Sequence, residues 1–135
     1  MATMAKPPVL VVLAITLCLA LSCGTCPSAP SITSVSPAAA TAGGSQFVLT
    51  VNGDDFRHDS VVKWNSSSLV TTFGSSHQLL AAVTAADIAQ PGTVLVFVFN
   101  PPEGGGTTFS GAIGRTSTTL CGSKNSNGVS FTITP

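Results

Sequence analysis

The sequence predicts an all-β sandwich of about seven short strands that follows an N-terminal signal segment. Apolar and polar residues alternate with a period of two along much of the chain, which is typical of strands with one buried face. These runs are rich in Val, Phe, Thr and Leu, and Gly, Pro, Asn and Asp separate them at intervals of about eight to fifteen residues. Because no convincing amphipathic helix accompanies them, two packed sheets are the expected architecture.

Seven segments carry this strand pattern. The first alternates Ile32 and Val35 with hydroxyl residues, and the others repeat the same alternation with larger side chains. A helical pattern is confined to 85–90, where Pro91 directly follows and would end a helix. The expected strands are 31–36, 46–52, 61–64, 69–73, 78–84, 93–100 and 128–134.

Proline and glycine residues mark the ends of these strands. Pro37 ends the first strand and removes a backbone donor that could pair with another chain. Gly53 follows an asparagine in a pair that readily adopts positive φ, so we expect a tight turn there. The segment 93–99 is apolar on both faces, which predicts a central strand whose outer face is half covered by the long loop that follows. The alternative is a dedicated binding face.

The N-terminal segment has the features of a secretory signal. An apolar run from Val9 to Leu21 is too short to span a hydrocarbon core of about 30 Å. Lys6 provides a weakly basic start, and small residues stand at the exit of the run. We therefore expect the segment 1–22 to be removed during export.

Cys23 comes directly after this run and suggests a lipoprotein signal, in which the thiol is acylated and becomes the new amino terminus. The match is imperfect, because Leu21 stands one place later than in the usual lipoprotein motif. Ala20 and Ser22 would equally suit ordinary signal peptidase, which would leave a soluble secreted protein. Gly24 is not the aspartate associated with inner-membrane retention, so an anchor at the outer membrane or the cell surface is favoured.

Composition narrows the possible partners. The whole chain carries five basic and five acidic residues, and charged residues make up 7% of it. Without a basic patch there is no case for nucleic acid binding, and steering of a charged ligand would be weak. The remaining length suits one domain.

From about Pro30 to its end the chain resembles the IPT/TIG module, an immunoglobulin-like fold found in bacterial surface proteins, plexins and some transcription factors. The resemblance rests on several short motifs in the family's order, in both halves of the domain. The matching stretches are PSITSVSP (30–37), AGG (42–44), FVLTVNG (47–53) with Phe56, SVVKWN (60–65), QL (78–79), AAV (81–83), AQPG (89–92), NPP (100–102), GGG (104–106) and VSFTI (129–133). It implies a noncatalytic immunoglobulin-like sandwich over 30–135 behind a short tether, 23–29.

The resemblance also implies a structural core of aromatic residues. Trp64, the only tryptophan, is expected between the sheets, and Phe56 is expected to fold back onto the core. Phe47 and Phe131 complete the predicted core. The sharper alternative is an exposed Trp64 that stacks on a sugar, although its place at the end of a valine-rich strand favours burial.

The chain departs from the family pattern at 107–125, an insertion of roughly fifteen to twenty residues before the last strand. A connection of this length is usually functional or disordered, and its composition leaves both open. Because loops are where such domains normally bind, Phe109, Arg115 and Lys124 are candidate binding residues.

The cysteines connect this insertion to the tether. If Cys18 leaves with the signal and Cys23 carries lipid, Cys26 and Cys121 remain and should pair in an oxidising compartment. In the resembled fold, the start of the first strand and the loop before the last strand share one pole, which would allow this disulfide. If Cys23 is not acylated, three thiols remain and the pairing is ambiguous.

Catalysis and metal binding have little support in the sequence. The acidic residues near His58 lack the order of a calcium loop, and His58 and His77 would lack further zinc ligands if the thiols are bridged. A nucleophile-elbow motif is absent as well. We expect no enzyme activity, cofactor or metal, and a module that binds a protein or polysaccharide, or supports an envelope assembly, with its acyl anchor in the membrane. The alternative is a small secreted metal-binding protein or hydrolase that uses His58 and Asp59.

Overall fold

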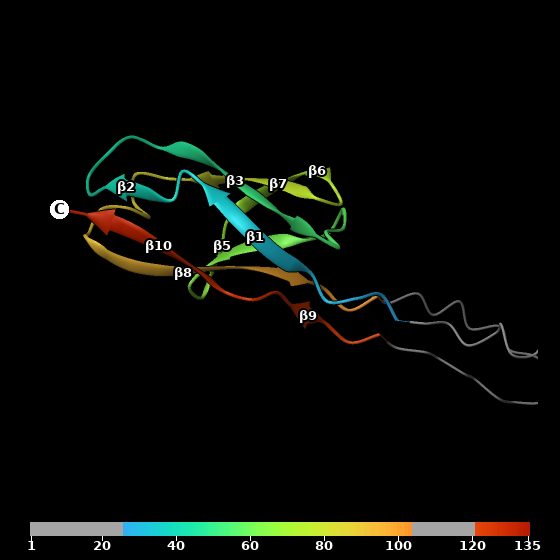
Figure 1. Cartoon of the computed structure of the whole chain (residues 1–135). Helices are drawn as coiled ribbons and strands as arrows, with labels where there is room; N and C mark the ends of the chain where they lie inside the picture. Colours follow the sequence, from blue (N-terminus) through green and yellow to red (C-terminus); the bar gives the residue numbers. More distant parts are fainter. Residues whose placement is uncertain (1–25, 104–120) are drawn as a thin grey trace, which may run out of the picture.

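The computed structural model describes residues 26–103 and 121–135, which form two β-sheets packed face to face (Figure 1). The secondary structure within these two ranges consists of strands and turns, without a helix. The all-β sandwich expected from the sequence is therefore confirmed.

The first sheet has four antiparallel strands in the order β1, β3, β7 and β6. Its inward residues alternate along each strand, as in β3, where Leu49 and Val51 are fully buried. The strands are β1 (Ser31–Ser36), β3 (Phe47–Asp54), β6 (Val70–Ser75) and β7 (Gln78–Val83).

The second sheet has six strands, and its main path runs β2, β10, β8, β4 and β5. β2 is parallel to β10, whereas the other pairings are antiparallel, and β9 extends the pairing of β8 beyond the start of β10. The strands are β2 (Ala39–Thr41), β4 (Val61–Trp64), β5 (Ser67–Ser68), β8 (Gly92–Asn100), β9 (Lys124–Asn125) and β10 (Val129–Thr134).

All seven predicted strands are present, with bounds that differ from the prediction by at most two residues. The three further strands, β2, β5 and β9, have two or three residues each. Their small and polar side chains show no alternation, because segments this short pair by backbone hydrogen bonds alone.

The predicted turn at Gly53 is wrong. Gly53 lies inside β3 and pairs with Ile32 of β1. The chain bends at Asp55, which has a φ of 60°, and the turn follows at 57–60, where the Ser60 nitrogen donates to the Arg57 carbonyl oxygen at 3.0 Å. A Cβ atom on Gly53 would lie 1.9 Å from the carbonyl oxygen of Ser31 and 2.8 Å from Cζ of Phe56. Glycine is needed here for the close approach of two chain segments, and not for positive φ.

The helical pattern at 85–90 does not produce a helix. Thr84 donates to the Asp87 Oδ2 atom from its backbone nitrogen at 2.8 Å and from its hydroxyl at 2.7 Å. This side-chain bond closes a turn, and Ile88 anchors it with 1% of its surface exposed. Pro91 follows too soon for a second helical turn.

Three of the four predicted core aromatics are buried. Phe131 is fully buried, and Phe56 and Trp64 are nearly so, whereas Phe47 is half-buried at the margin of the core. The ring centroid of Phe131 lies 5.0 Å from that of Trp64 and 6.0 Å from that of Phe47. Phe131 therefore links the aromatic residues of both sheets.

β8 is a central strand with two apolar faces. Val94, Val96 and Val98 point into the core, while Phe97 and Phe99 are half-buried on the outer face. The Lys63 Nζ atom lies 5.5 Å from the Phe99 ring centroid, so the lysine side chain partly covers this face. Most of the loop that was expected to cover it lies outside the described residues.

Candidate functional site

The strands end at two poles, which Figure 1 places at opposite ends of the sandwich. We call the end that holds Cys26, Asn100 and Cys121 the entry pole. The end that holds Asp87 and Ile133 we call the pocket pole. β8 connects the two, since Gly92 pairs with Ile133 at one end and Asn100 pairs with Lys124 at the other.

A disulfide joins Cys26 to Cys121 at the entry pole, with an Sγ–Sγ distance of 2.08 Å and a sequence separation of 95 residues. Beside it, the backbone nitrogen of Glu103 donates to the carbonyl oxygen of Cys121 at 3.1 Å. The disulfide expected in the resembled fold is thus present. Cys23, the predicted lipidation site, lies outside the described residues.

A buried polar network lies behind the disulfide. Asn100 is only 1% exposed, and its Oδ1 accepts a hydrogen bond from the Ser60 hydroxyl. Its Nδ2 donates to the carbonyl oxygen of Asp55 at 3.1 Å, so both ends of the amide are paired. The Ser60 hydroxyl also accepts from the backbone nitrogen of Arg57 at 2.7 Å. The network ties the turn after β3 to the end of β8.

Arg57 connects this turn to the segment beside the disulfide. Its Nη2 atom lies 2.7 Å from Asp59 Oδ2, and its Nη1 atom lies 3.4 Å from Glu103 Oε1. Nη1 also donates to the carbonyl oxygen of Pro101 at 3.3 Å. Asp59, a residue of the alternative catalytic hypothesis, is therefore engaged in an ion pair.

The two histidines make separate surface contacts. The His58 ring lies against Phe73, with ring centroids 4.1 Å apart, while His77 Nδ1 lies 2.8 Å from Asp54 Oδ1. Across residues 26–103 and 121–135, no three His, Cys, Asp or Glu side chains gather as a metal site would require. Within the same ranges no helix is long and apolar enough to cross a membrane.

The candidate binding residues of the insertion are only partly described. Lys124 lies in β9, half-buried at the entry pole. Phe109 and Arg115 lie outside the described residues, so their role stays a prediction.

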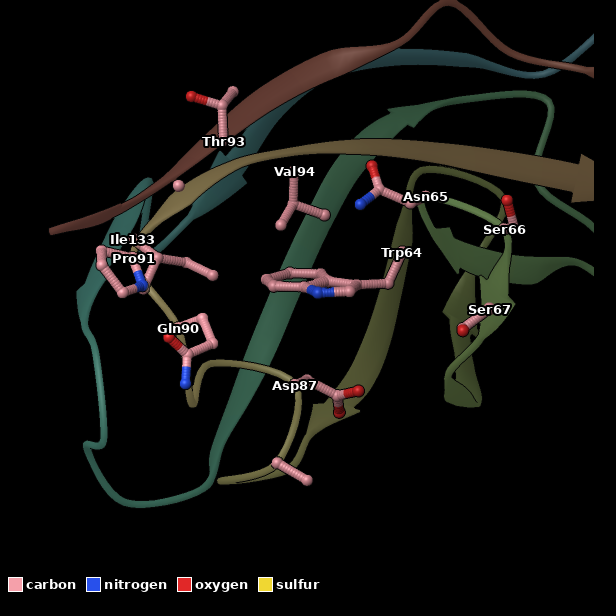
Figure 2. Close-up of a pocket in the computed structure, with 12 residues that line it drawn as sticks. Trp64, Asn65, Ser66, Ser67, Asp87, Gln90, Pro91, Thr93, Val94 and Ile133 are labelled. Atoms are coloured by element: carbon pink, nitrogen blue, oxygen red, sulfur yellow. The ribbon is translucent and has the colours of Figure 1, made fainter.

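The pocket pole contains an open pocket of about 410 Å³, which we call the Trp64 pocket (Figure 2). Three segments form it: the end of β4 with the turn to β5, the turn between β7 and β8 together with the start of β8, and the end of β10. The lining residues are Trp64, Asn65, Ser66, Ser67, Ala86, Asp87, Gln90, Pro91, Gly92, Thr93, Val94 and Ile133.

The inner part of the pocket is apolar. Trp64 lies across it in Figure 2, beside Val94 and Ile133, and each of these three side chains is at least nine-tenths buried. Because the indole also packs against Phe131, its position is fixed by the core. The expected burial of Trp64 is therefore confirmed, and the alternative of an exposed Trp64 that stacks on a sugar is wrong.

Two turns hold the rim of the pocket. Asn65 has a φ of 51°, and its backbone nitrogen and side-chain Oδ1 form hydrogen bonds of 2.8 Å with the Leu95 carbonyl oxygen and nitrogen, respectively. On the opposite side, the Thr84 bonds described above fix Asp87. Both rim segments thus have a defined conformation before any ligand arrives.

Two polar groups of the pocket are left for a ligand. The Trp64 indole nitrogen donates to none of the described residues, although the side chain is 5% exposed. Trp64 lines the pocket, so this N–H is a candidate donor to a ligand. Asp87 belongs to none of the ion pairs in the described ranges, and it is the one charged residue among the lining residues that the structure describes.

The sequence did not predict this pocket. Trp64 was assigned correctly to the core, but the pocket depends on bringing residues near 65, 87 and 133 together, and only the folded chain does so. The spacing of Thr84 and Asp87, a hydroxyl followed three residues later by an acid, was the available local indication of a fixed turn.

Residues 30–133 match the family model described as the IPT/TIG domain. No match to a curated protein was found.

Proposed function

The chain belongs to the IPT/TIG domain family, and on that premise we propose that it is a noncatalytic binding module of the bacterial cell envelope. In this proposal the segment 1–22 exports the chain, Cys23 carries the lipid anchor, and 23–29 is the tether. The domain 30–135 then binds a protein or polysaccharide in the Trp64 pocket, at the outer membrane or the cell surface.

The separation of the two poles is the observation that supports this proposal most. Cys26, three positions after Cys23, is bonded to Cys121 at the entry pole. The pocket lies beyond the other end of β8, whose nine residues span about 26 Å at about 3.3 Å per residue. A lipid on Cys23 would hold the entry pole near the membrane and direct the pocket outward.

The same arrangement ranks the two candidate binding regions. Lys124 and Cys121 belong to the entry pole, so the insertion 107–125 would begin or end close to the membrane. The Trp64 pocket would meet an external ligand first. We therefore propose the pocket, and not Phe109, Arg115 and Lys124, as the principal binding site.

Mass analysis of the exported protein tests the anchor. We expect the mature wild-type chain to begin at Cys23, to carry the mass of attached acyl chains and to partition into detergent. Cys23→Ala should carry no acyl mass and stay in the aqueous phase. An unmodified wild-type chain that begins at or after residue 23 would exclude the lipid anchor.

A photocrosslinking experiment on whole cells tests the pocket. Benzoylphenylalanine in place of Ser66, at the pocket rim, is expected to capture an envelope component. The same group in place of Thr72, an exposed residue of β6, serves as the matched control. Equal capture from both positions, or none from Ser66, would contradict a binding site in the pocket.

A further inference from the structure

We propose that the ligand of the Trp64 pocket is a neutral carbohydrate, whose hydroxyl groups accept from Trp64 Nε1 and donate to the Asp87 carboxylate. This inference rests on the binding role proposed above and names the ligand class.

The first argument is the unpaired indole N–H. Trp64 is only 5% exposed, and its ring packs against Phe131 at a centroid distance of 5.0 Å. A donor that meets no acceptor among the described residues can pair with water or with a ligand oxygen. Because Trp64 lines the pocket and its ring is held by the core, this N–H offers a fixed donor to a ligand oxygen.

The second argument is the carboxylate on the opposite rim. Thr84 supplies two hydrogen bonds to Asp87 Oδ2, so this oxygen is already occupied while Oδ1 receives none from the described residues. An ionised carboxylate only accepts hydrogen bonds, so its ligand partner must be a donor. Its negative charge disfavours phosphate, sulfate and acidic sugars, because no basic residue lines the described pocket.

A hydroxyl group meets both requirements, since it donates one hydrogen bond and accepts others. Gln90, Ser66 and Ser67 add side chains of the same dual character around the rim (Figure 2). A molecule with several adjacent hydroxyl groups and no charge fits this set better than an apolar ligand or an anion. Carbohydrates are the biological molecules with that composition.

The mode of contact differs from stacking on an aromatic face. Because Trp64 is only 5% exposed and its ring packs against Phe131, we expect a sugar to meet an edge of the ring and not its face. The contact area is small, so the affinity of one pocket should be in the millimolar range. Many copies anchored in one membrane would bind a polysaccharide more tightly than one copy does.

The chain contains a single tryptophan, which makes its fluorescence a direct reporter of the pocket. We would titrate the full mature protein, in a detergent without a sugar headgroup, with the neutral trisaccharides maltotriose, cellotriose and chitotriose. Trigalacturonic acid, putrescine and the peptide Gly-Ser-Gly are the comparison ligands. At least one neutral trisaccharide should shift the Trp64 emission, and the three comparison ligands should not.

Variants assign the contact to the two groups. Trp64→Phe keeps the aromatic ring but removes the N–H, and Asp87→Asn keeps an acceptor for Thr84 but removes the charge. Each should weaken trisaccharide binding, measured by calorimetry, about tenfold, which corresponds to about 1.4 kcal/mol. Gln90→Ala should weaken it as well, whereas Gln78→Ala, on exposed β7 surface, should have no effect. Far-ultraviolet circular dichroism of every variant checks that the sandwich remains folded.

Specific outcomes overturn the inference. Putrescine that binds while no trisaccharide does would make the pocket a cation site. No trisaccharide binding tighter than about 10 mM would exclude the ligand class. If the Ser66 crosslink forms but its partner is destroyed by protease and not by periodate, the proposed binding function stands and the carbohydrate inference fails. Without any Ser66 crosslink, the binding function itself fails.

Discussion

The entry pole and the pocket pole lie at the two ends of the same strands, yet they differ in whether their polar side-chain groups are hydrogen-bonded within the protein. At the entry pole the buried amide of Asn100 is paired at both ends, and the Cys26–Cys121 disulfide adds a covalent link. At the pocket pole the Trp64 N–H and the Asp87 Oδ1 atom have no partner among the described residues.

This difference follows from what each pole can do. Fully paired buried groups stabilise one conformation and leave nothing for a ligand. Unpaired groups on a fixed rim contribute little to folding but can form hydrogen bonds with a bound molecule. We therefore expect substitutions at the entry pole to lower stability and spare binding, and those at the pocket pole to do the reverse.

The largest effect is expected from Cys26→Ser combined with Cys121→Ser. Removal of a cross-link between residues 95 positions apart should lower the free energy of unfolding by about 4 kcal/mol, because the unfolded chain gains freedom. Urea unfolding under oxidising conditions measures this loss. Trisaccharide affinity, measured well below the unfolding transition, should stay within twofold of wild type. A parallel loss of affinity would show that the two poles are coupled.

An intermediate effect is expected from Asn100→Ala. The change leaves the Ser60 hydroxyl and the Asp55 carbonyl without their buried partner, which should cost about 2 kcal/mol of unfolding free energy. Asn125→Ala, at an exposed position of the neighbouring β9, is the matched control and should change stability by less than about 0.5 kcal/mol. Equal losses in thermal denaturation would mean that burial of the amide is not the cause.

The smallest effect on stability is expected at Asn65, on the pocket rim. Asn65→Ala should be less stable than Asn65→Gly by about 1 kcal/mol, because the φ of 51° disfavours alanine and suits glycine. Both variants lose the acceptor for the Leu95 nitrogen, so both should weaken ligand binding more than they lower stability. If the two variants are equally stable, the turn has changed conformation.

The sequence predicted the strands well because period-two alternation is a local property that survives in the fold. β10 is the clearest case, since Phe131 and Ile133 are buried while Ser130 and Thr132 beside them are exposed. The predictions that were wrong depended on contacts between distant segments. Gly53 was assigned to a turn because its pair with asparagine favours one, but the backbone of β1 and the Phe56 ring determine its place inside β3.

The candidate site was much less predictable than the fold. Trp64 could be assigned to the core from its strand, but whether its N–H is paired depends on Asp87 and Gln90, which approach it only after the sheets pack. Conversely, the acidic residues near His58 made a metal or acid–base site the alternative interpretation of the sequence. In the folded chain His58 packs against Phe73, and Asp59 pairs with Arg57.

The disulfide has a mechanical consequence for an anchored protein. If tension acts between Cys23 and Pro135, the covalent link from Cys26 to Cys121 carries it past every strand from β1 to β8. Only residues 122–135 can then be drawn out, by separating β9 and β10 from β8 and β10 from β2. The rest of the domain, including the β4 turn that bears Trp64, would remain closed under forces that would otherwise unravel it from its amino-terminal end.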